Sequence, residues 1–406
     1  MKKKKTLFIE LDGATWDIIN PLVRQGKLPN IKRLIESGAS GELISVLPAI
    51  SPKIWTSIFT GKHHDKTGID FFGGHSKMVK CKRMWDIFNQ SGLKVGILGS
   101  FVTWPPYEVN GFMIPAVDSV GTETYPPEYS FFQEIALNER RKSKGIESKA
   151  LPFINLFYYA HKLNTTGVNS NTFLQILSYL VQEKVRRFRQ RDKYWRKLVL
   201  HSEISTDVFI HLCKLFDPDF ATIHMHICDS ICHRYWMAYE PEKFPGIDQA
   251  VAKRYREVIP KAYMQADKAI GKLLASTNGA VNVAVVSDHG FKAVSGGMNP
   301  YDLDINKFLD ILGIREKVIV ARFGPGMYIN FRDEGHMQEA ADVVSNARLQ
   351  GTDKKVFNAR PFEKTLIVTK PNWKVVKSIY VRQPRCQEFT KREASSSLPD
   401  PILSMA

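Results

Sequence analysis

Four short apolar runs, each ending in polar residues, constrain the fold of this chain most strongly. They cover residues 7–11, 94–98, 220–227 and 281–286, and helical patterns such as residues 29–35 lie between them. Strands that alternate with helices build a mostly parallel sheet with helices on both faces, and such sheets bind ligands beyond the carboxyl ends of their strands. We therefore predict an α/β fold with a functional site where the runs end.

Composition sets wider limits on the protein. A chain of 406 residues with 44% hydrophobic content can bury a large core, and its net charge of +16 attracts anions without selecting one. Five cysteines are too few and odd in number for a disulfide framework, which favours a reducing compartment. The apolar stretch after the N-terminal lysines is too short for export, and no run reaches the roughly 18 apolar residues of a spanning helix. We expect a cytoplasmic protein with no transmembrane segment.

Residues 125–203 lack the alternation of strands and helices and are rich in aromatic and basic side chains. We interpret them as a helical insertion or cap within a discontinuous α/β domain, which covers residues 1–124 and 204–380. A weakly structured tail would follow over residues 381–406.

Within this insertion, the apolar run at residues 173–181 leads into a basic run at residues 184–191. This pattern is typical of an amphipathic helix with a solvated basic face, and less often of a surface that contacts acidic lipid or substrate. Charge alone does not predict a nucleic-acid partner, because the chain carries no recognised nucleic-acid-binding module.

Asp288 and His289 follow the last apolar run, which we expect to be a buried strand. A carboxylate beside an imidazole at the end of a strand is a natural way to hold a divalent metal. Asp12, followed by Gly13, ends the first run in the same way, although an Asp-Gly pair after a strand is more often a turn or a helix cap.

Asp229 and His233 follow the third run and lie four residues apart. On a helix both side chains would project from one face and grip the same cation, but a helix cap with an exposed histidine is an equally good interpretation. The neighbouring Cys228 and Cys232 have no second cysteine pair at ligand spacing, so we interpret them as small buried hydrophobes.

Ser51 precedes Pro52 at the start of a helical pattern. A serine before such a proline is a good N-cap, with the proline at the first helical position. Its hydroxyl would also face the positive end of the helix dipole, where phosphates bind. Beside a metal ion it could act as a nucleophile.

The order of these motifs resembles the alkaline phosphatase superfamily, and within it the type I phosphodiesterase/nucleotide pyrophosphatase family. The resemblance covers roughly residues 5–120 and 205–335. Its segments are Leu11-Asp12-Gly13, residues 48–57 around Ser51 with Thr60-Gly61, Asp229 with His233, and Ser287-Asp288-His289-Gly290-Phe291.

This resemblance implies a metal-dependent phosphohydrolase with two divalent cations, for which we expect Zn²⁺, with Mn²⁺ as the alternative. Around the first metal it implies Asp12, Ser51, Asp288 and His289, and around the second Asp229 and His233. Ser51 takes the place of the nucleophile and would form a covalent phospho-enzyme with a phosphorylated small molecule or a nucleotide. A phosphomonoesterase or phosphotransferase of the same superfamily remains the alternative activity.

The second metal usually has a third ligand in this family, a histidine in the C-terminal third. After His289 the chain contains only His336, which follows a strand-like run at residues 328–331 and lies upstream of the expected motif, so we do not assign it. Three explanations remain: a truncated or diverged C-terminal region, which we favour, a substitute ligand, or a lost second metal. The last would leave an inactive relative that binds anions.

Overall fold

The computed structural model of the chain describes residues 5–46, 49–70, 74–116, 119–134, 165–186, 190–244, 246–277 and 281–293, and shorter stretches between residues 309 and 389. The described residues divide into two compact units. The first contains residues up to 68 and from 75 to 293, and the second contains residues 69, 70 and 74 and those from 309 onward. The division into residues 1–124 and 204–380, with an insertion at 125–203 and a tail at 381–406, stays a prediction.

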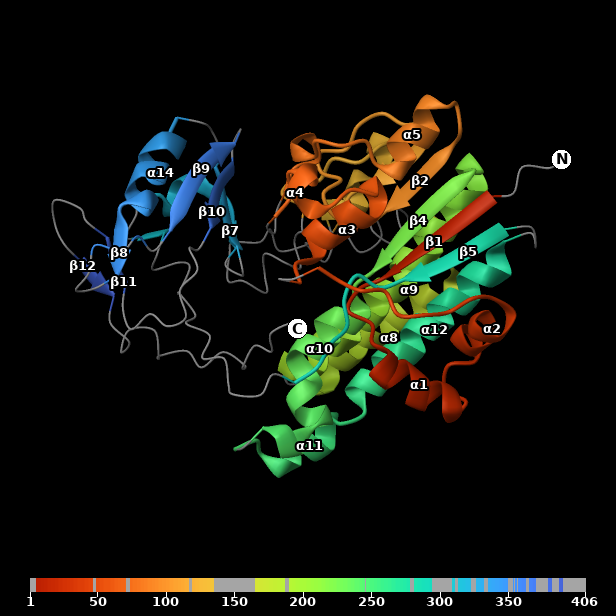
Figure 1. Cartoon of the computed structure of the whole chain (residues 1–406). Coiled ribbons are helices and arrows are strands. Elements are labelled where there is room, and N and C mark those ends of the chain that lie inside the picture. The colour runs from red at the N-terminus through yellow and green to blue at the C-terminus, as the bar shows by residue number, and fades with distance from the viewer. Residues whose placement is uncertain are drawn as a thin grey trace. The chain divides into compact units, whose positions relative to one another are not determined.

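A five-stranded parallel sheet forms the centre of the first unit, with the strand order β3-β2-β4-β1-β5 (Figure 1). Its strands are β1 (Lys5–Leu11), β2 (Val95–Leu98), β3 (Gly111–Ile114), β4 (Phe220–Met225) and β5 (Val281–Val286). The predicted α/β fold with a mostly parallel sheet is confirmed. The third run ends two residues earlier than predicted, because Ile227 already begins a helix, and the short strand β3 was not predicted.

Helices cover both faces of this sheet (Figure 1). On one face lie α3 (Ser51–Thr60) and α5 (Met84–Gln90), whose Trp55, Phe59 and Trp85 are buried against strand residues such as Phe8. The other face is covered by α1 (Trp16–Arg24), α2 (Pro29–Ser37), α9 (Gln190–Phe216), α10 (Ile227–Tyr239) and α12 (Val258–Ser276). Successive residues of a strand point to opposite faces, so Leu7, Ile9 and Leu11 join this second cluster.

Strand β5 lies at the edge of the sheet and is half-buried along its length, with Val285 37% exposed. The interpretation of residues 281–286 as a buried strand was therefore wrong, although the strand itself was correctly predicted. A run with four valines fits an edge strand equally well, because apolar content does not show how many neighbours a strand has.

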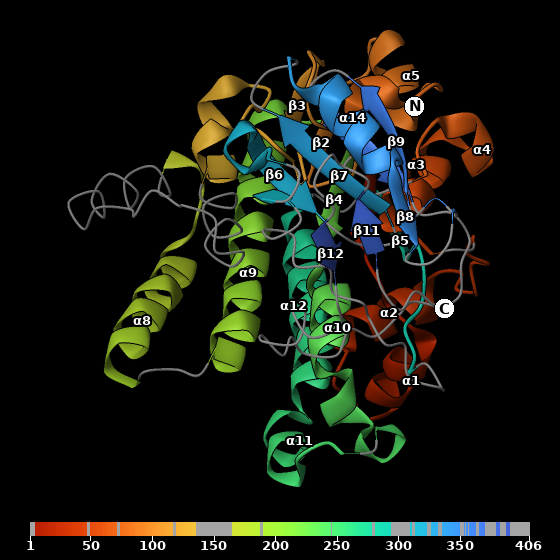
Figure 2. The ribbon, with the colours of Figure 1, turned by 90° about the vertical axis from the view of Figure 1, so that its left-hand side faces the viewer.

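The helix α8 (Ser170–Arg186) packs along α9 on the outer side of the first unit (Figure 2). Together these two helices account for the apolar and basic runs, while residues 187–189 and 135–164 lie outside the described part of the chain. Among the described residues, no helix is long and apolar enough to cross a membrane.

The remaining elements of the first unit are the short helices α4 (His64–Thr67), η1 (Ser76–Met78), η2 (Pro127–Tyr129), η4 (Pro241–Lys243) and α11 (Gln249–Tyr255). The second unit contains η5 (Arg315–Lys317), β6 (Val318–Arg322), β7 (Gly326–Phe331), α14 (Met337–Ser345), β8 (Ala347–Leu349), β9 (Asn358–Phe362), β10 (Thr365–Thr369), β11 (Ile379–Val381) and β12 (Gln387–Phe389). The strands β6, β7, β10 and β9 form one antiparallel sheet, and β12, β11 and β8 form another.

Candidate functional site

Parallel pairing brings the carboxyl ends of three strands to the same edge of the sheet. In β1, Leu11 pairs with Met225 of β4, and Glu10 pairs with Val286 of β5. The backbone amide of Asp12 donates a hydrogen bond to the carbonyl oxygen of Met225 over 3.1 Å. The residues that follow these strands are thereby collected at one place.

Three of the predicted metal ligands meet at this edge. Asp12, Asp288 and His289 are buried, and each offers a ligand atom within 4.8 Å of the other two. The Nε2 atom of His289 lies 3.6 Å from Asp12 Oδ1 and 3.4 Å from Asp288 Oδ2. Across the part of the chain that the structure describes, this is the one group of three or more such residues that could hold a metal ion.

The hydrogen bond of the other nitrogen, Nδ1, determines which nitrogen of His289 is available to a metal ion. Its Nδ1 atom lies 2.9 Å from the carbonyl oxygen of Gly290, which can only accept, so Nδ1 donates this hydrogen bond. In the neutral ring, Nε2 then carries the lone pair and points to the carboxylates. Burial lowers the pKa of His289, but the charges of Asp288 and Asp12 outweigh it and raise that pKa above its usual value.

Ser51 is the first residue of α3 and its hydroxyl joins this group. The Oγ atom lies 3.2 Å from His289 Nε2 and donates a hydrogen bond to Asp12 Oδ1 over 3.4 Å. The N-cap interpretation of Ser51 was wrong, since the helix begins at Ser51 and its N-cap residue is Ile50, which makes no side-chain cap. The hydroxyl faces the Asp12 carboxylate and the His289 imidazole instead of the helix amides.

Asp229 and His233 lie on one face of α10, as their spacing predicts. Asp229 Oδ1 is 3.3 Å from His233 Nε2, and the His233 ring packs edge-on against Phe291 at 4.9 Å between ring centroids. The negative charge of Asp229 outweighs burial and raises the pKa of His233. These two residues are not part of the three-residue group, so the structure brings the six predicted side chains together as a group of four and a neighbouring pair.

The glycine after Asp12 allows this close approach. Gly13 has a φ of +65°, and a Cβ at this position would lie 2.8 Å from the Cβ of Asp229. The Asp229 amide also donates to the carbonyl oxygen of Asp12 over 3.1 Å. Contact between the two backbones fixes the start of α10 against the end of β1.

The donor set fits divalent cations. Asp288 Oδ2 and Asp229 Oδ1 are buried but accept no hydrogen bond, although each lies close to an imidazole nitrogen. Burial and the neighbouring Asp12 raise the pKa of Asp288 well above its usual value. For Asp12, burial also acts to raise the pKa, but the hydrogen bond from His224 and the charges of His224 and His289 hold it below the usual value. A cation would give the two orphaned oxygens a partner and relieve the repulsion between carboxylates.

Cys228 and Cys232 do not contribute to this site. Both are fully buried, both are free, and burial raises the pKa of each thiol, which disfavours the thiolate that zinc would need. Their interpretation as small buried hydrophobes agrees with this environment.

Two residues next to the site were missed by sequence reasoning. His224 of β4 donates to Asp12 through Nε2 and to Glu10 through Nδ1, and both side chains are buried. Glu10 and His224 are direct register partners in β1 and β4. The signal was a polar residue in the middle of each of two apolar strands, which becomes meaningful only once their register is known.

His336 lies in the second unit, where it is the N-cap residue of α14 and its Nδ1 is 3.2 Å from Lys317 Nζ. The predicted strand before it is confirmed as β7. We assign His336 no ligand role.

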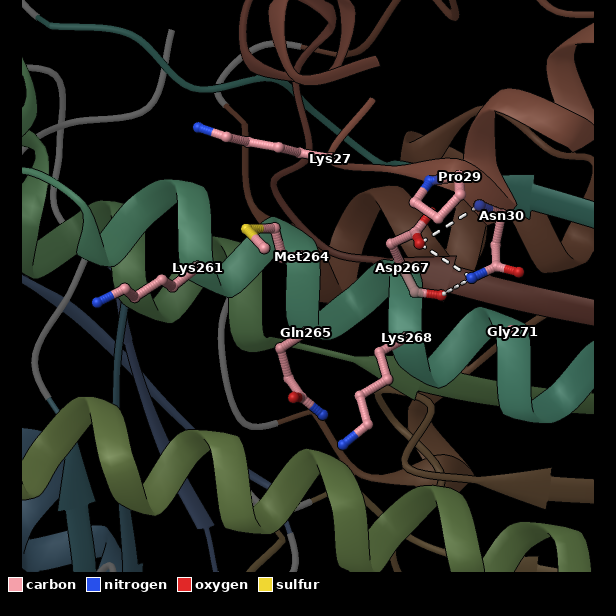
Figure 3. Close-up of a pocket in the computed structure, with 9 residues that line it drawn as sticks. All are labelled: Lys27, Pro29, Asn30, Lys261, Met264, Gln265, Asp267, Lys268 and Gly271. Carbon is pink, nitrogen blue, oxygen red and sulfur yellow. Dashed lines mark hydrogen bonds between the residues drawn. The ribbon is translucent and has the colours of Figure 1, made fainter. Parts of the chain in front are cut away.

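An open pocket between α2 and α12 holds none of the predicted site residues (Figure 3). Asp267 occupies the amide end of α2, where it accepts hydrogen bonds from the Ile31 amide over 2.7 Å and the Asn30 amide over 3.3 Å. This carboxylate already satisfies the donors that would attract an anion.

The chain matches the family model described as type I phosphodiesterase / nucleotide pyrophosphatase over residues 6–365. Because this match spans most of the sequence, the chain belongs to that family, as its motifs predicted. It is a hydrolase of the phosphodiesterase and pyrophosphatase type.

Solved structures and curated proteins were also compared with the chain. Crystal structures of phosphonoacetate hydrolase from Sinorhizobium meliloti 1021 match with TM-scores of 0.45 for the complex with phosphonoformate and 0.42 for that with phosphonoacetate. Each match has 13% sequence identity and covers 99% of this chain and 87% of the other. No curated protein gives a match.

Proposed function

We propose that this protein hydrolyses phosphate diesters or nucleotide pyrophosphates through a covalent phosphoserine at Ser51, with two divalent cations at the strand ends. The single observation that carries the proposal is the position of Ser51 Oγ, 3.2 Å from His289 Nε2 and 3.4 Å from Asp12 Oδ1. A nucleophile within the same buried group as the metal donors is the arrangement that two-metal phosphoryl transfer needs.

The two cations would be bound by different residues. Asp12, Asp288 and His289, with Ser51, would hold the first, while Asp229 and His233 would hold the second. Mixed carboxylate and imidazole donors suit Zn²⁺, with Mn²⁺ as the alternative. When bound, the cations would supply positive charge that stabilises the attacking and leaving oxygens of the phosphoryl group.

The chain's own residues would carry the rest of the reaction. Ser51 gives its proton to solvent, and Oγ forms a bond to phosphorus while the bond from phosphorus to the leaving oxygen breaks. The leaving group departs with the electron pair and takes a proton from solvent. Water then cleaves the phosphoserine, which restores the hydroxyl and releases the phosphate product. The positive end of the α3 dipole favours the anionic substrate beside Ser51.

The test is hydrolysis of bis(p-nitrophenyl) phosphate by metal-loaded protein. We expect Ser51→Ala to lose about a thousandfold or more of kcat, and Ser51→Thr to retain measurable activity. Ser57→Ala is the matched control, because the Ser57 hydroxyl lies on the same helix and donates to the carbonyl oxygen of Lys53 over 3.0 Å. Full activity in Ser51→Ala would reject the phosphoserine. Faster hydrolysis of p-nitrophenyl phosphate than of the diester would favour the phosphomonoesterase alternative.

We also propose that α8 and the basic run contact an anionic lipid surface. Leu174 and Val181, one heptad apart on α8, are 62% and 60% exposed. Residues 184–197 contain eight Lys or Arg and one Asp, so an apolar face leads directly into a strongly positive segment. Both features suit binding at a lipid interface.

A cytoplasmic location remains part of the proposal. It is supported by the free state of the four described cysteines, Cys81, Cys213, Cys228 and Cys232. Fractionation of cells that produce the protein would test it.

A further inference from the structure

A chain of buried polar groups runs beneath the metal donors, from Glu10 through His224 to Asp12. Nδ1 of His224 lies 3.0 Å from Glu10 Oε2, and Nε2 lies 3.1 Å from Asp12 Oδ2. Glu10 has no exposed surface, and its other oxygen, Oε1, accepts hydrogen bonds from the hydroxyls of Thr222, over 2.6 Å, and Ser100. Both oxygens of Glu10, both nitrogens of His224 and Oδ2 of Asp12 therefore have hydrogen-bond partners.

We propose that Glu10 and His224 are positioning residues that hold Asp12 in the orientation needed to bind the first metal. This inference rests on the proposed function, and it deepens it by assigning roles to two residues that do not touch the metal. His224 takes up Asp12 Oδ2, which leaves Oδ1 directed toward Ser51 and His289.

The surroundings of His224 hold its imidazole ring in one orientation. Both nitrogens of His224 face carboxylates, so both donate, and the ring cannot turn without breaking two charge-assisted hydrogen bonds. The rings of Trp55 and Phe101 lie nearly perpendicular to it, with centroids 5.6 Å and 4.9 Å away. The imidazole is thus held by hydrogen bonds at both nitrogens and by aromatic contacts.

Stability of the sheet alone does not account for this arrangement. Glu10 and His224 are opposite each other in two central strands, where apolar side chains would pack without any desolvation cost. Replacing buried ion pairs by apolar residues is often neutral or stabilising. The positive charge of His224 between two carboxylates also limits the negative charge beneath the metal, and hydrogen bonds to ligating carboxylates are known to tune metal affinity.

The experiment measures the Kd for Zn²⁺ by competition with a chromophoric chelator, for the wild-type protein, His224→Gln and Glu10→Gln. We expect each substitution to raise the Kd of the tighter site by about 10- to 100-fold. In the Asp12→Asn background, adding His224→Gln should change the Kd little, because the carboxylate that His224 positions is already absent.

Glu203→Gln is the matched control for loss of a buried carboxylate. Glu203 is buried between α9 and α12, where it accepts hydrogen bonds from Lys268, Lys272 and Gln265. This variant should lower the melting temperature but keep the wild-type Kd. Far-UV circular dichroism checks that each variant is folded. If His224→Gln does not fold, Glu10→Gln alone provides the test.

The outcomes separate the two proposals. If the wild-type protein binds Zn²⁺ and both variants keep its Kd, the positioning role is overturned while the proposed function stands. If the Kd rises equally in Glu203→Gln, the effect is one of general stability and the positioning role is again rejected. If the wild-type protein binds no divalent metal, the proposed function itself fails.

Discussion

The backbone amide of Asp229 donates a hydrogen bond to the carbonyl oxygen of Asp12 over 3.1 Å, which ties the start of α10 to the end of β1. Gly13 makes this contact possible, because a Cβ there would lie 2.9 Å from the Asp229 Cα. We predict that Gly13→Ala displaces Asp229, weakens binding of the second metal and lowers the rate of diester hydrolysis by about tenfold or more.

Gly26 provides a matched control for this substitution. Its φ of +70° is similar to that of Gly13, but a Cβ at Gly26 would meet no atom within 4 Å. Gly26→Ala should therefore lower stability by about 1–2 kcal/mol through backbone strain alone, without a change in hydrolysis. Equal hydrolysis rates in the two variants would show that the contact does not position Asp229.

Removal of metal should reverse the effect of Asp288 on stability. Burial and Asp12 raise the pKa of Asp288, so its ionisation at neutral pH destabilises the metal-free fold relative to the unfolded chain. We predict that Asp288→Asn raises the melting temperature in the presence of a chelator, where roughly 1–2 °C corresponds to about 1 kcal/mol for a chain of this length. The same variant should lose the stabilisation that added Zn²⁺ gives to the wild-type protein.

Asp267→Asn is the control for that measurement. This buried carboxylate accepts hydrogen bonds from the Ile31 and Asn30 amides, so the variant should melt at a lower temperature with and without metal. A lower melting temperature for Asp288→Asn in chelator would argue against the orphaned carboxylate as a metal donor.

A half-buried pair of histidines should make stability depend on pH. Burial lowers the pKa of His201 to about 4, and its ring lies 4.8 Å from that of His226, whose pKa is also lowered. Since the unfolded chain protonates His201 near its ordinary pKa of about 6.5, the folded protein loses stability as the pH falls from about 6.5 to 4. We predict that His201→Gln reduces this loss by up to about 1.4 kcal/mol per pH unit, measured by urea unfolding. If the free energy of unfolding of His201→Gln depends on pH as that of the wild-type protein does, the prediction is contradicted.

The sequence predicted which side chains gather at this edge of the sheet better than the contacts that position them. Asp12, Asp229 and Asp288 could be found because polar residues after apolar runs collect at one edge of a parallel sheet. His224 could not, because a single histidine between apolar neighbours reads as a core residue until its register with Glu10 is known. The orientation of the Ser51 hydroxyl was likewise decided by tertiary contacts and not by the local N-cap pattern.

For the fold, the apolar runs that end in polar residues were informative. Four of the five strands of the parallel sheet were predicted, including β2 with only four residues, whereas β3 lies between Pro106 and Pro115 and was missed. Burial of β5 was misjudged because its position at the sheet edge depends on strand order, which the sequence does not encode locally.

The exposed face of α8 predicts binding to acidic membranes. We expect the protein to sediment with vesicles of phosphatidylcholine and phosphatidylserine, and to be released by salt. The double variant Leu174→Ser, Val181→Ser should bind about tenfold or more weakly, because it removes two exposed apolar side chains. Leu215→Ser is the control, since Leu215 is 61% exposed at the end of α9. Equal binding to vesicles of phosphatidylcholine alone would contradict an electrostatic contact.

The metal centre is tested most directly by anomalous scattering at the zinc edge from crystals of the protein grown with Zn²⁺. We predict one peak among Asp12, Ser51, Asp288 and His289, and a second beside Asp229 and His233. The second peak would also reveal which group supplies the ligand that the family usually draws from a third histidine. A structure of the Zn²⁺-saturated protein with no peak between Asp12, Asp288 and His289 would contradict the account.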